Sequence, residues 1–266
     1  MTAHDKHCKR LARRTCPLAV LVCVFMAMSG CQTNVKDEAT VHATWKYSLV
    51  SIPKEMTVDG SRCVGSFASK KNRECLEKIA PDRKYPLIVF MHGCAGLLGP
   101  SRNLVTNFRT LGYAAVAPDS FVRLGRKANC SGGGGKRQIL SLRVSEIEYA
   151  LQQIAMLDWV DRSHLILAGF SEGAQAVALY RGDGVFAGYI VMGFGCGRGI
   201  GHGVQASGPV LAIQGARDPI SKGHCSVAFR ENSASITVPK AEHDVSSYPE
   251  TVAALRKFLG TVAPAD

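Results

Sequence analysis

Short, mostly apolar runs recur along the chain and are separated by stretches with helical spacing. Continuous apolar runs of this length are typical of strands that are buried on both faces of a sheet. They predict strands over residues 87–91, 113–117, 165–168, 187–192, 209–214 and 234–238. Alternating and β-branched residues favour an edge strand over 44–52, and the mixed segment 57–80 favours a hairpin or a loop closed by a disulfide.

The stretches between these runs predict helices. Their spacing favours helices over residues 103–111, 138–157 and 247–259, and a helix of small residues after Ser171. Over 138–157 the apolar residues form one stripe, while Arg143 and Glu146 fall on a polar or buried ionic side. Strands that alternate with helices imply an α/β protein with a mostly parallel, doubly covered sheet.

One junction between strand and helix contains a candidate nucleophile. Gly169-Phe170-Ser171-Glu172-Gly173 fits G-x-S-x-G, in which a serine at a sharp turn exposes its hydroxyl oxygen. A side chain at Gly169 or Gly173 would collide with the neighbouring strand or helix. The helix N-terminus behind Ser171 favours developing negative charge. An ordinary glycine-flanked turn fits the same letters, but the strand before it and the helix after it are the context that the pattern requires.

An attacking serine needs an imidazole to take its proton and a carboxylate to orient that imidazole. Asp218 and His243 follow Ser171 in this order, each just past a predicted strand, so all three fall at the same edge of the sheet. The competing candidates downstream of the serine are Asp183, Asp244, His202 and His224. Asp183 has no strand before it, and Asp244 adjoins His243, where neighbouring side chains tend to point apart.

The strand over 87–91 ends in a glycine turn, His92-Gly93-Cys94, at the edge where open α/β sheets build their sites. Such a turn can aim a backbone N–H into a pocket. The predicted donors of an oxyanion hole are therefore the backbone N–H of Cys94 and that of Glu172, which follows the serine. An ordinary connection between strand and helix is the alternative. His92 precedes the serine, and its expected role is to shape the turn.

These residues resemble the dienelactone hydrolase-like branch of the α/β-hydrolase superfamily. The resemblance covers about residues 44–260 and rests on Tyr85–Gly93, Gly112–Phe121, the G-x-S-x-G segment, Asp218 and His243. It implies the α/β-hydrolase fold and a Ser-His-Asp triad. Dienelactone hydrolase itself carries cysteine at the nucleophile position, whereas this chain has Ser171.

The composition excludes several other classes. The chain has 266 residues, 46% of them hydrophobic, which suits one globular domain. Its net charge is +11, of which residues 1–30 carry +4, and the moderately basic remainder favours anionic surfaces or substrates. No arginine-rich run or interleaved aromatic stripe indicates nucleic-acid binding. The glycines before Lys136 do not form a phosphate-binding loop. The pattern G-x-x-x-x-G-K-[ST] requires glycine at position 130 and serine or threonine at position 137, where this chain has Cys130 and Arg137. The glycines of 193–203 lack G-x-G-x-x-G spacing, so a dinucleotide site is not supported.

Residues 1–30 have the pattern of a targeting segment. Basic residues up to Arg14 lead into an apolar run over 16–27 that is too short for a permanent membrane span. The sequence Met28-Ser29-Gly30-Cys31 then resembles the lipobox of bacterial lipoproteins. This resemblance implies cleavage before Cys31 and attachment of lipid to it.

The residues after Cys31 extend this interpretation. Residues 31–43 are short and polar and suit a tether. Gln32 is not the aspartate that retains lipoproteins at the inner membrane, so the resemblance implies the periplasmic face of the outer membrane. The alternative is an ordinary signal peptide that leaves a soluble periplasmic or secreted protein.

Six further cysteines follow: Cys63, Cys75, Cys94, Cys130, Cys196 and Cys225. An even number in an exported chain suggests three disulfides. Proximity in the expected fold favours Cys63–Cys75, Cys94–Cys130 and Cys196–Cys225. A zinc set of Cys196, His202, His224 and Cys225 is the alternative, but neither C-x-x-C nor H-x-x-x-H spacing supports it.

Together, these features predict a lipid-anchored serine hydrolase of the bacterial cell envelope with a single α/β-hydrolase domain over 44–266. The best fit is a carboxylic ester hydrolase that acts on a small-molecule ester through an acyl-enzyme, without metal or organic cofactor. A peptidase or amidase would use the same triad. A non-catalytic envelope binding protein on a hydrolase scaffold is the alternative from a different class. The membrane is the other expected partner, through the lipid on Cys31.

Overall fold

The computed structural model describes residues 40–126, 130, 136–182, 185–195, 204–205, 207–221 and 231–262. Residues from Val41 onward form one compact unit. The targeting segment, Cys31 and most of the expected tether lie outside the described residues. Among the described residues, no helix is long and apolar enough to cross a membrane.

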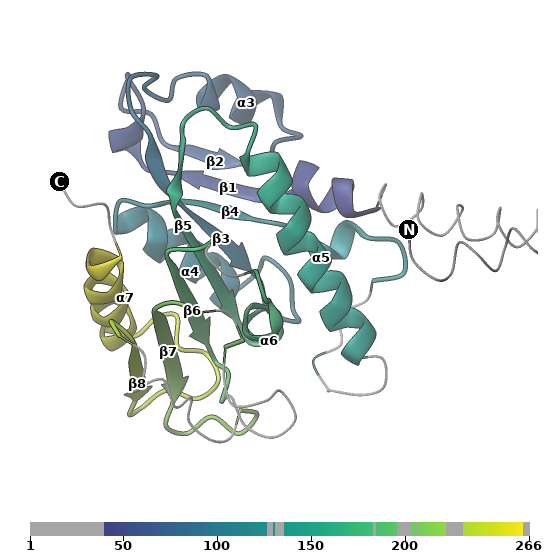
Figure 1. Ribbon diagram of the computed structural model, residues 1–266, viewed down its shortest axis with the longest axis vertical. Helices are drawn as coiled ribbons and strands as arrows, with labels where there is room; N and C mark the ends of the chain where they lie inside the picture. The colour runs from purple at the N-terminus through teal and green to yellow at the C-terminus, as the bar shows by residue number, and fades with distance from the viewer. Residues whose placement is uncertain are drawn as a thin grey trace, which may run out of the picture. The chain divides into compact units, whose positions relative to one another are not determined.

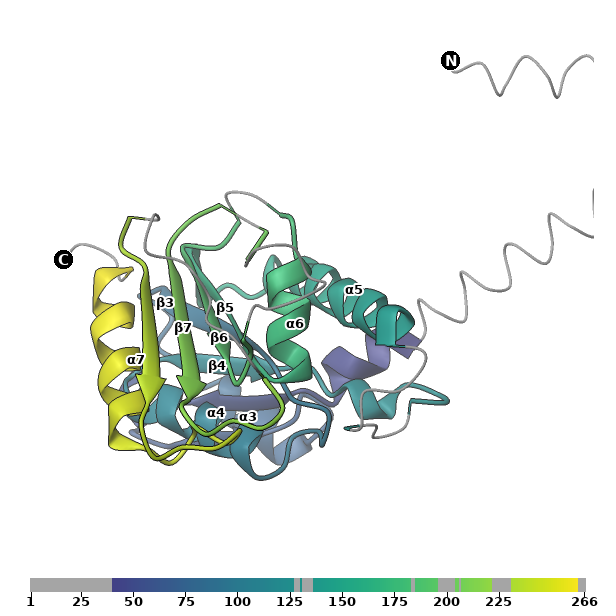
Figure 2. The ribbon, with the colours of Figure 1, turned by 90° about the horizontal axis from the view of Figure 1, so that it is seen from below.

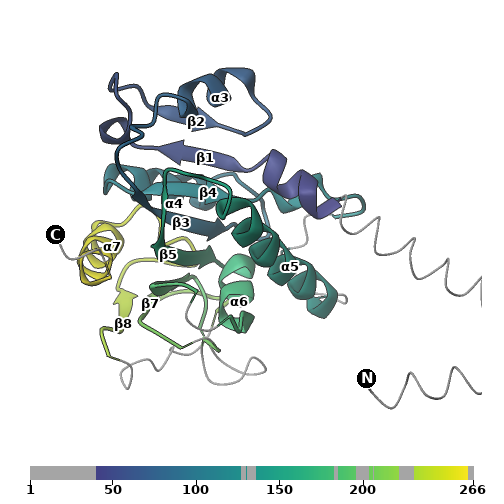
Figure 3. The ribbon, with the colours of Figure 1, turned by 45° about the horizontal axis from the view of Figure 1, so that its top comes forward.

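An eight-stranded sheet forms the centre of this unit (Figure 1). Its strands are β1 (Leu49–Ile52), β2 (Cys63–Gly65), β3 (Tyr85–Met91), β4 (Ala114–Ala117), β5 (Val160–Phe170), β6 (Gly188–Met192), β7 (Val210–Gly215) and β8 (Ala234–Val238). The order across the sheet is β2-β1-β4-β3-β5-β6-β7-β8, which Figure 3 shows from β2 at the top to β8 at the bottom. From β4 to β8 all neighbouring strands are parallel, and β1 is antiparallel to both of its neighbours.

Helices cover both faces of the sheet (Figure 2). The helices are α3 (Lys70–Leu76), α4 (Pro100–Thr110), α5 (Lys136–Ile154), α6 (Glu172–Leu179) and α7 (Pro249–Thr261), with 3-10 turns η1 (Lys54–Met56) and η2 (Ser120–Val122). Apolar residues of α5 and α6 pack on one face and those of α4 and α7 on the other. Within β3, Val89 faces the first layer and Phe90 the second, because successive side chains of a strand point to opposite faces. The expected doubly covered, mostly parallel sheet is confirmed.

The expectation for residues 44–52 was partly wrong. Residues 41–46 are helical, and the strand begins at Leu49. Trp45 of this helical segment stacks on Phe67 with 4.8 Å between the ring centroids, so a side chain in the supposed strand packs into the core instead. β1 is not an edge strand, because β2 pairs along its outer side.

The segment 57–80 contains β2 and α3, which a disulfide between Cys63 and Cys75 joins, as expected. The disulfide between Cys94 and Cys130 is also present. Cys196 and Cys225 lie outside the described residues, so their pairing stays a prediction.

Candidate active site

Ser171 lies at the turn between β5 and α6 in a backbone conformation that non-glycine residues rarely adopt, with φ 54° and ψ −114°. The flanking glycines make this turn possible. A Cβ on Gly173 would lie 1.9 Å from the carbonyl oxygen of Met91, and one on Gly169 would lie 2.6 Å from the backbone of Gly173. The collision expected from the G-x-S-x-G pattern is therefore present at both positions, and the turn holds the Ser171 hydroxyl beyond the end of the sheet.

The ends of β7 and β8 supply the other two candidate residues. His243 Nε2 lies 2.8 Å from Ser171 Oγ, and His243 Nδ1 lies 2.9 Å from Asp218 Oδ2. The end of β7, just before Asp218, packs closely against the loop that carries His243. A Cβ on Gly215 would lie only 1.9 Å from the carbonyl oxygen of Glu242. The structure thus brings the three predicted residues into one hydrogen-bonded chain.

The carboxylate of Asp218 is buried and fully hydrogen-bonded. Its Oδ1 accepts from the backbone N–H of Ile220 at 2.8 Å and of Ser221 at 3.0 Å, while Oδ2 faces His243. Burial alone would raise the pKa of Asp218, but the hydrogen bonds from Ser221, His243 and Ile220 outweigh it and lower the pKa. Asp218 is therefore a carboxylate at neutral pH and can orient the His243 ring and stabilise its charged form.

The two predicted oxyanion donors lie at neighbouring turns. Cys94 follows β3 and Glu172 begins α6, and β3 and β5 are paired in register as far as Met91 and Gly169. Neither backbone N–H donates to an acceptor in the part of the chain that the structure describes. The disulfide to Cys130 also anchors the turn that contains Cys94.

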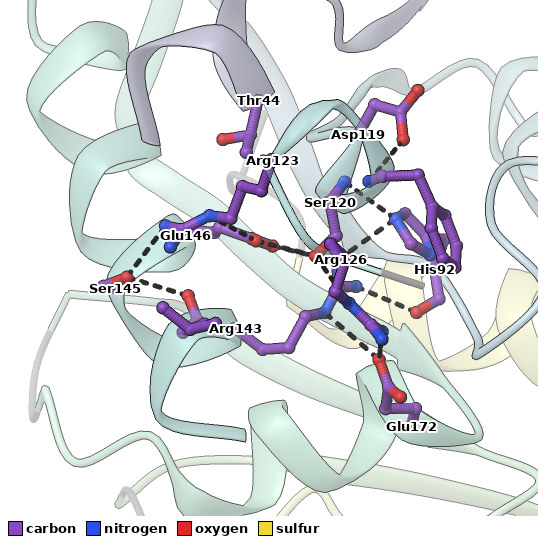
Figure 4. A network of polar contacts seen from close by, with 12 residues as sticks. Thr44, His92, Asp119, Ser120, Arg123, Arg126, Arg143, Ser145, Glu146 and Glu172 are labelled. Atoms are coloured by element: carbon purple, nitrogen blue, oxygen red, sulfur yellow. Dashed lines mark hydrogen bonds and ion pairs between the residues drawn. The ribbon is translucent and has the colours of Figure 1, made fainter. Parts of the chain in front are cut away.

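Behind these turns lies a cluster of charged and polar side chains that we call the buried ion network: His92, Ser120, Arg123, Arg126, Arg143, Glu146 and Glu172 (Figure 4). Arg143 and Glu146 of α5 pair at 2.8 Å, and both side chains are fully buried. Arg126 pairs with Glu172, whose backbone N–H is a predicted donor. The sequence predicts a polar or buried ionic side for Arg143 and Glu146. No sequence pattern indicated that Arg126 and the Glu172 carboxylate form an ion pair, because the two residues are far apart along the chain.

The competing candidates that lie within the described residues are not part of the hydrogen-bonded chain Ser171–His243–Asp218. Asp244 Oδ1 accepts a hydrogen bond from the backbone of Ser246 at 2.8 Å. His92 is fully buried, and its Nδ1 lies 2.7 Å from the carbonyl oxygen of Gly93, so it shapes the turn as expected. Asp183, His202 and His224 lie outside the described residues, as does the alternative zinc set. Within the described residues, no group of three or more His, Cys, Asp or Glu side chains could hold a metal ion.

Solved structures with a similar fold include Est1E from Butyrivibrio proteoclasticus bound to ferulic acid. The identity is 17%, the match covers 67% of this chain and 89% of that one, and the TM-score is 0.50. A protein assigned as a dienelactone hydrolase, from Klebsiella pneumoniae, is 17% identical over 69% of this chain and 89% of that one, with a TM-score of 0.49. No protein-family model and no curated protein sequence matches the chain. The sheet topology and the similarity to Est1E show that the chain has the α/β-hydrolase fold.

Proposed function

We propose that this protein is a serine hydrolase that cleaves carboxylic esters. Ser171 attacks the ester carbonyl carbon, and His243 takes the serine proton and passes it to the leaving alcohol. Asp218 holds the His243 ring through Nδ1 and stabilises its charged form. The resulting acyl-enzyme is released by water, which His243 activates in the same way. The backbone N–H groups of Cys94 and Glu172 stabilise the negative oxygen that develops in both steps.

The observation that carries this proposal is the hydrogen-bonded chain from Ser171 through His243 to Asp218, with contacts of 2.8 and 2.9 Å. These contacts lie within the range in which a base can take a proton from its nucleophile. The positive φ of Ser171 supports the proposal further, because a strained backbone conformation persists only where the surrounding structure holds it. We propose esters rather than amides as substrates because the sequence resembles the dienelactone hydrolase-like branch.

Hydrolysis of p-nitrophenyl acetate and butyrate by the purified protein tests the proposal, with Ser171→Ala beside it. The wild type should release p-nitrophenol, and the variant should fall to the background rate. A fluorophosphonate probe should label the wild type at Ser171 and leave the variant unlabelled. Anilide analogues and methyl ferulate extend the panel, the latter because the Est1E structure holds ferulic acid. If the wild type neither hydrolyses any of these compounds nor reacts with the probe, the catalytic assignment is wrong.

We further propose that the enzyme acts in the cell envelope, anchored by lipid on Cys31. The two disulfides support an oxidising compartment, because disulfides persist in exported proteins and are rare in the cytosol. The lipobox-like sequence before Cys31 is the basis for the anchor.

A further inference from the structure

The guanidinium group of Arg143 contacts both segments that carry the proposed oxyanion donors. Its Nη2 donates to the carbonyl oxygen of His92 at 2.8 Å, and its Nη1 lies 3.2 Å from His92 Nε2. Its Nε lies 3.9 Å from a carboxylate oxygen of Glu172. One side chain of α5 therefore joins the turn after β3 to the start of α6.

The contact with His92 fixes the state of its ring. Nε2 of His92 also accepts the backbone N–H of Ser120 at 3.0 Å, so two donors point at this nitrogen. Burial, together with the nearby charges of Arg143 and Arg126, lowers the pKa of His92 well below its ordinary value, and the ring is neutral. A neutral imidazole with an accepting Nε2 carries its hydrogen on Nδ1. Nδ1–H therefore donates to the carbonyl oxygen of Gly93, 2.7 Å away.

This last hydrogen bond determines where the N–H of Cys94 points. The carbonyl of Gly93 and the N–H of Cys94 belong to one planar trans peptide unit, in which the two groups point in opposite directions. A donor that holds the carbonyl therefore also aims the N–H. The carbonyl accepts a second hydrogen bond from the backbone N–H of Gly96 at 3.0 Å, which restrains the same peptide plane.

The second donor segment is held through the Glu172 carboxylate. This side chain is 10% exposed and pairs with Arg126 as well as facing Arg143. Because Glu172 is the first residue of α6, the ion pairs restrain the residue whose N–H faces the proposed oxyanion. Glu146 lies 2.8 Å from Arg143 and keeps the guanidinium in place.

The burial of these charges also argues for a role beyond stability. Removing arginines and carboxylates from water is unfavourable, and buried ion pairs often contribute no net stability. In this protein the buried charges converge on the two turns that flank Ser171.

We propose that Arg143 is a positioning residue that orients both oxyanion donors, the Cys94 N–H through His92 and the Glu172 N–H through the Glu172 carboxylate. This inference rests on the proposed serine hydrolase function. Within the described residues, Arg143 contacts His92, Glu146 and Glu172 and makes no hydrogen bond to Ser171. Arg143 should therefore affect how well the negative oxygen of the transition state is stabilised, and not how tightly the ester binds.

The test compares Arg143→Lys and Arg143→Met with the matched pair Arg123→Lys and Arg123→Met. Arg123 is also buried and also contacts Glu146, at 3.1 Å, and its Nη2 donates to the Ser145 hydroxyl at 3.1 Å. Steady-state hydrolysis of p-nitrophenyl butyrate gives kcat and KM. A propyl trifluoromethyl ketone, which forms a tetrahedral adduct with the serine, gives an inhibition constant that reports on the oxyanion donors. Urea unfolding gives the folded fraction, to which all rates are normalised.

Both Arg143 variants should lower kcat and kcat/KM equally, by about 10- to 100-fold, a part of the ~10²–10³-fold lost when one oxyanion donor is removed. The inhibition constant of the ketone should rise by the same factor, because it mimics the transition state. Arg143→Lys is expected to fold even if Arg143→Met does not, since it keeps the charge beside Glu146 but loses the fork of donors. The Arg123 variants should also change the unfolding midpoint, but they leave the hydrogen bond from Arg143 to the His92 carbonyl in place. They should therefore lower kcat and raise the inhibition constant by a much smaller factor than the Arg143 variants do.

Two results would overturn the inference while leaving the proposed function intact. One is a folded Arg143→Lys protein with wild-type kcat and ketone affinity. The other is an equal loss of both quantities in the Arg123 variants, which would indicate a general structural effect. A wild-type protein that neither hydrolyses the ester nor binds the ketone overturns the proposed function, and the inference fails with it.

Discussion

Two buried groups near Ser171 have charge states that the fold sets in opposite directions. Asp218 keeps its charge because three hydrogen bonds outweigh the cost of burial. His92 loses its proton because burial and two arginines disfavour the charged ring. Both states serve the proposed reaction, since an ionised Asp218 orients His243 and a neutral His92 can hold the Gly93 carbonyl.

The role of Asp218 leads to a kinetic prediction. In Asp218→Asn, the amide can donate to His243 Nδ1 and favour the wrong tautomer, in which Nε2 carries the hydrogen and cannot accept the serine proton. We expect kcat for p-nitrophenyl butyrate to fall by about 10⁴-fold, as it does when the aspartate of a Ser-His-Asp triad is replaced in this way. Asp244→Asn is the control, because the Asp244 side chain caps Ser246 instead. An Asp218→Asn protein with near wild-type kcat would remove Asp218 from the mechanism.

The neutral state of His92 predicts how stability depends on pH. The unfolded chain binds a proton at His92 near pH 6.5 whereas the folded chain does not, so the free energy of unfolding decreases as the pH falls below about 6.5. Between pH 6.5 and 5, this one group should remove up to about 2 kcal/mol. Urea unfolding of wild type and His92→Gln at both pH values measures the difference, and the variant should lose less stability. Equal losses in the two proteins would mean that His92 is protonated in the fold.

At the scale of elements, the site depends on how closely the strand-to-helix turn approaches its neighbours. The first turn of α6 packs directly against the end of β3. Only glycine fits at position 173, because a Cβ there would overlap the Met91 carbonyl. The same kind of contact joins the end of β7 to the loop of His243 at Gly215. Small residues at these points let three separate elements bring Ser171, Asp218 and His243 within hydrogen-bonding distance.

Gly173→Ala tests this close approach. The added methyl group would overlap backbone atoms that cannot move as a flexible side chain does, so we expect a destabilisation of about 3 kcal/mol or more and a loss of ester hydrolysis. Gly260→Ala is a matched control within α7, because a Cβ there meets nothing within 4 Å. It should leave stability unchanged or raise it by about 0.5–1 kcal/mol. Urea unfolding of both variants measures the contrast, and equal stabilities would show that the G-x-S-x-G turn tolerates a side chain at Gly173.

At the scale of the whole molecule, the compact unit from Val41 onward contains every described residue of the proposed site. The proposed anchor at Cys31 lies outside it. The anchor and the catalytic unit should therefore be separable in experiment.

Replacing the anchor cysteine tests this separation. When the full-length chain is expressed in a bacterial host, the wild type should incorporate labelled palmitate and fractionate with membranes. Cys31→Ser should incorporate no label and leave the membrane fraction, while ester hydrolysis per molecule stays unchanged. Cys8→Ser, in the proposed targeting segment, is the control and should behave as wild type. Absence of the label from the wild type would favour the ordinary signal peptide.

The six parallel strands from β3 to β8, the main helices and the fold class could be predicted because they follow from local patterns of apolar and small residues. The G-x-S-x-G turn and the order Ser, Asp, His also predicted which residues would meet, because the ends of parallel strands lie at one edge of a sheet. The helical segment 41–46 was missed because it is short and its packing partner, Phe67, is distant in the chain.

The sequence by itself determined the layers of this protein and the turn that carries Ser171, since each depends on residues close together in the chain. It also determined the positions of Asp218 and His243, because the carboxyl ends of parallel strands lie at one edge of the sheet. Tertiary structure alone decided the buried ion network. Its members come from four separate segments, and whether Arg143 is a solvated charge or a buried contact to His92 and Glu172 depends on how α5 packs against the sheet. Burial and long-range pairing of charges have no local pattern, and for that reason they appear only in the folded chain.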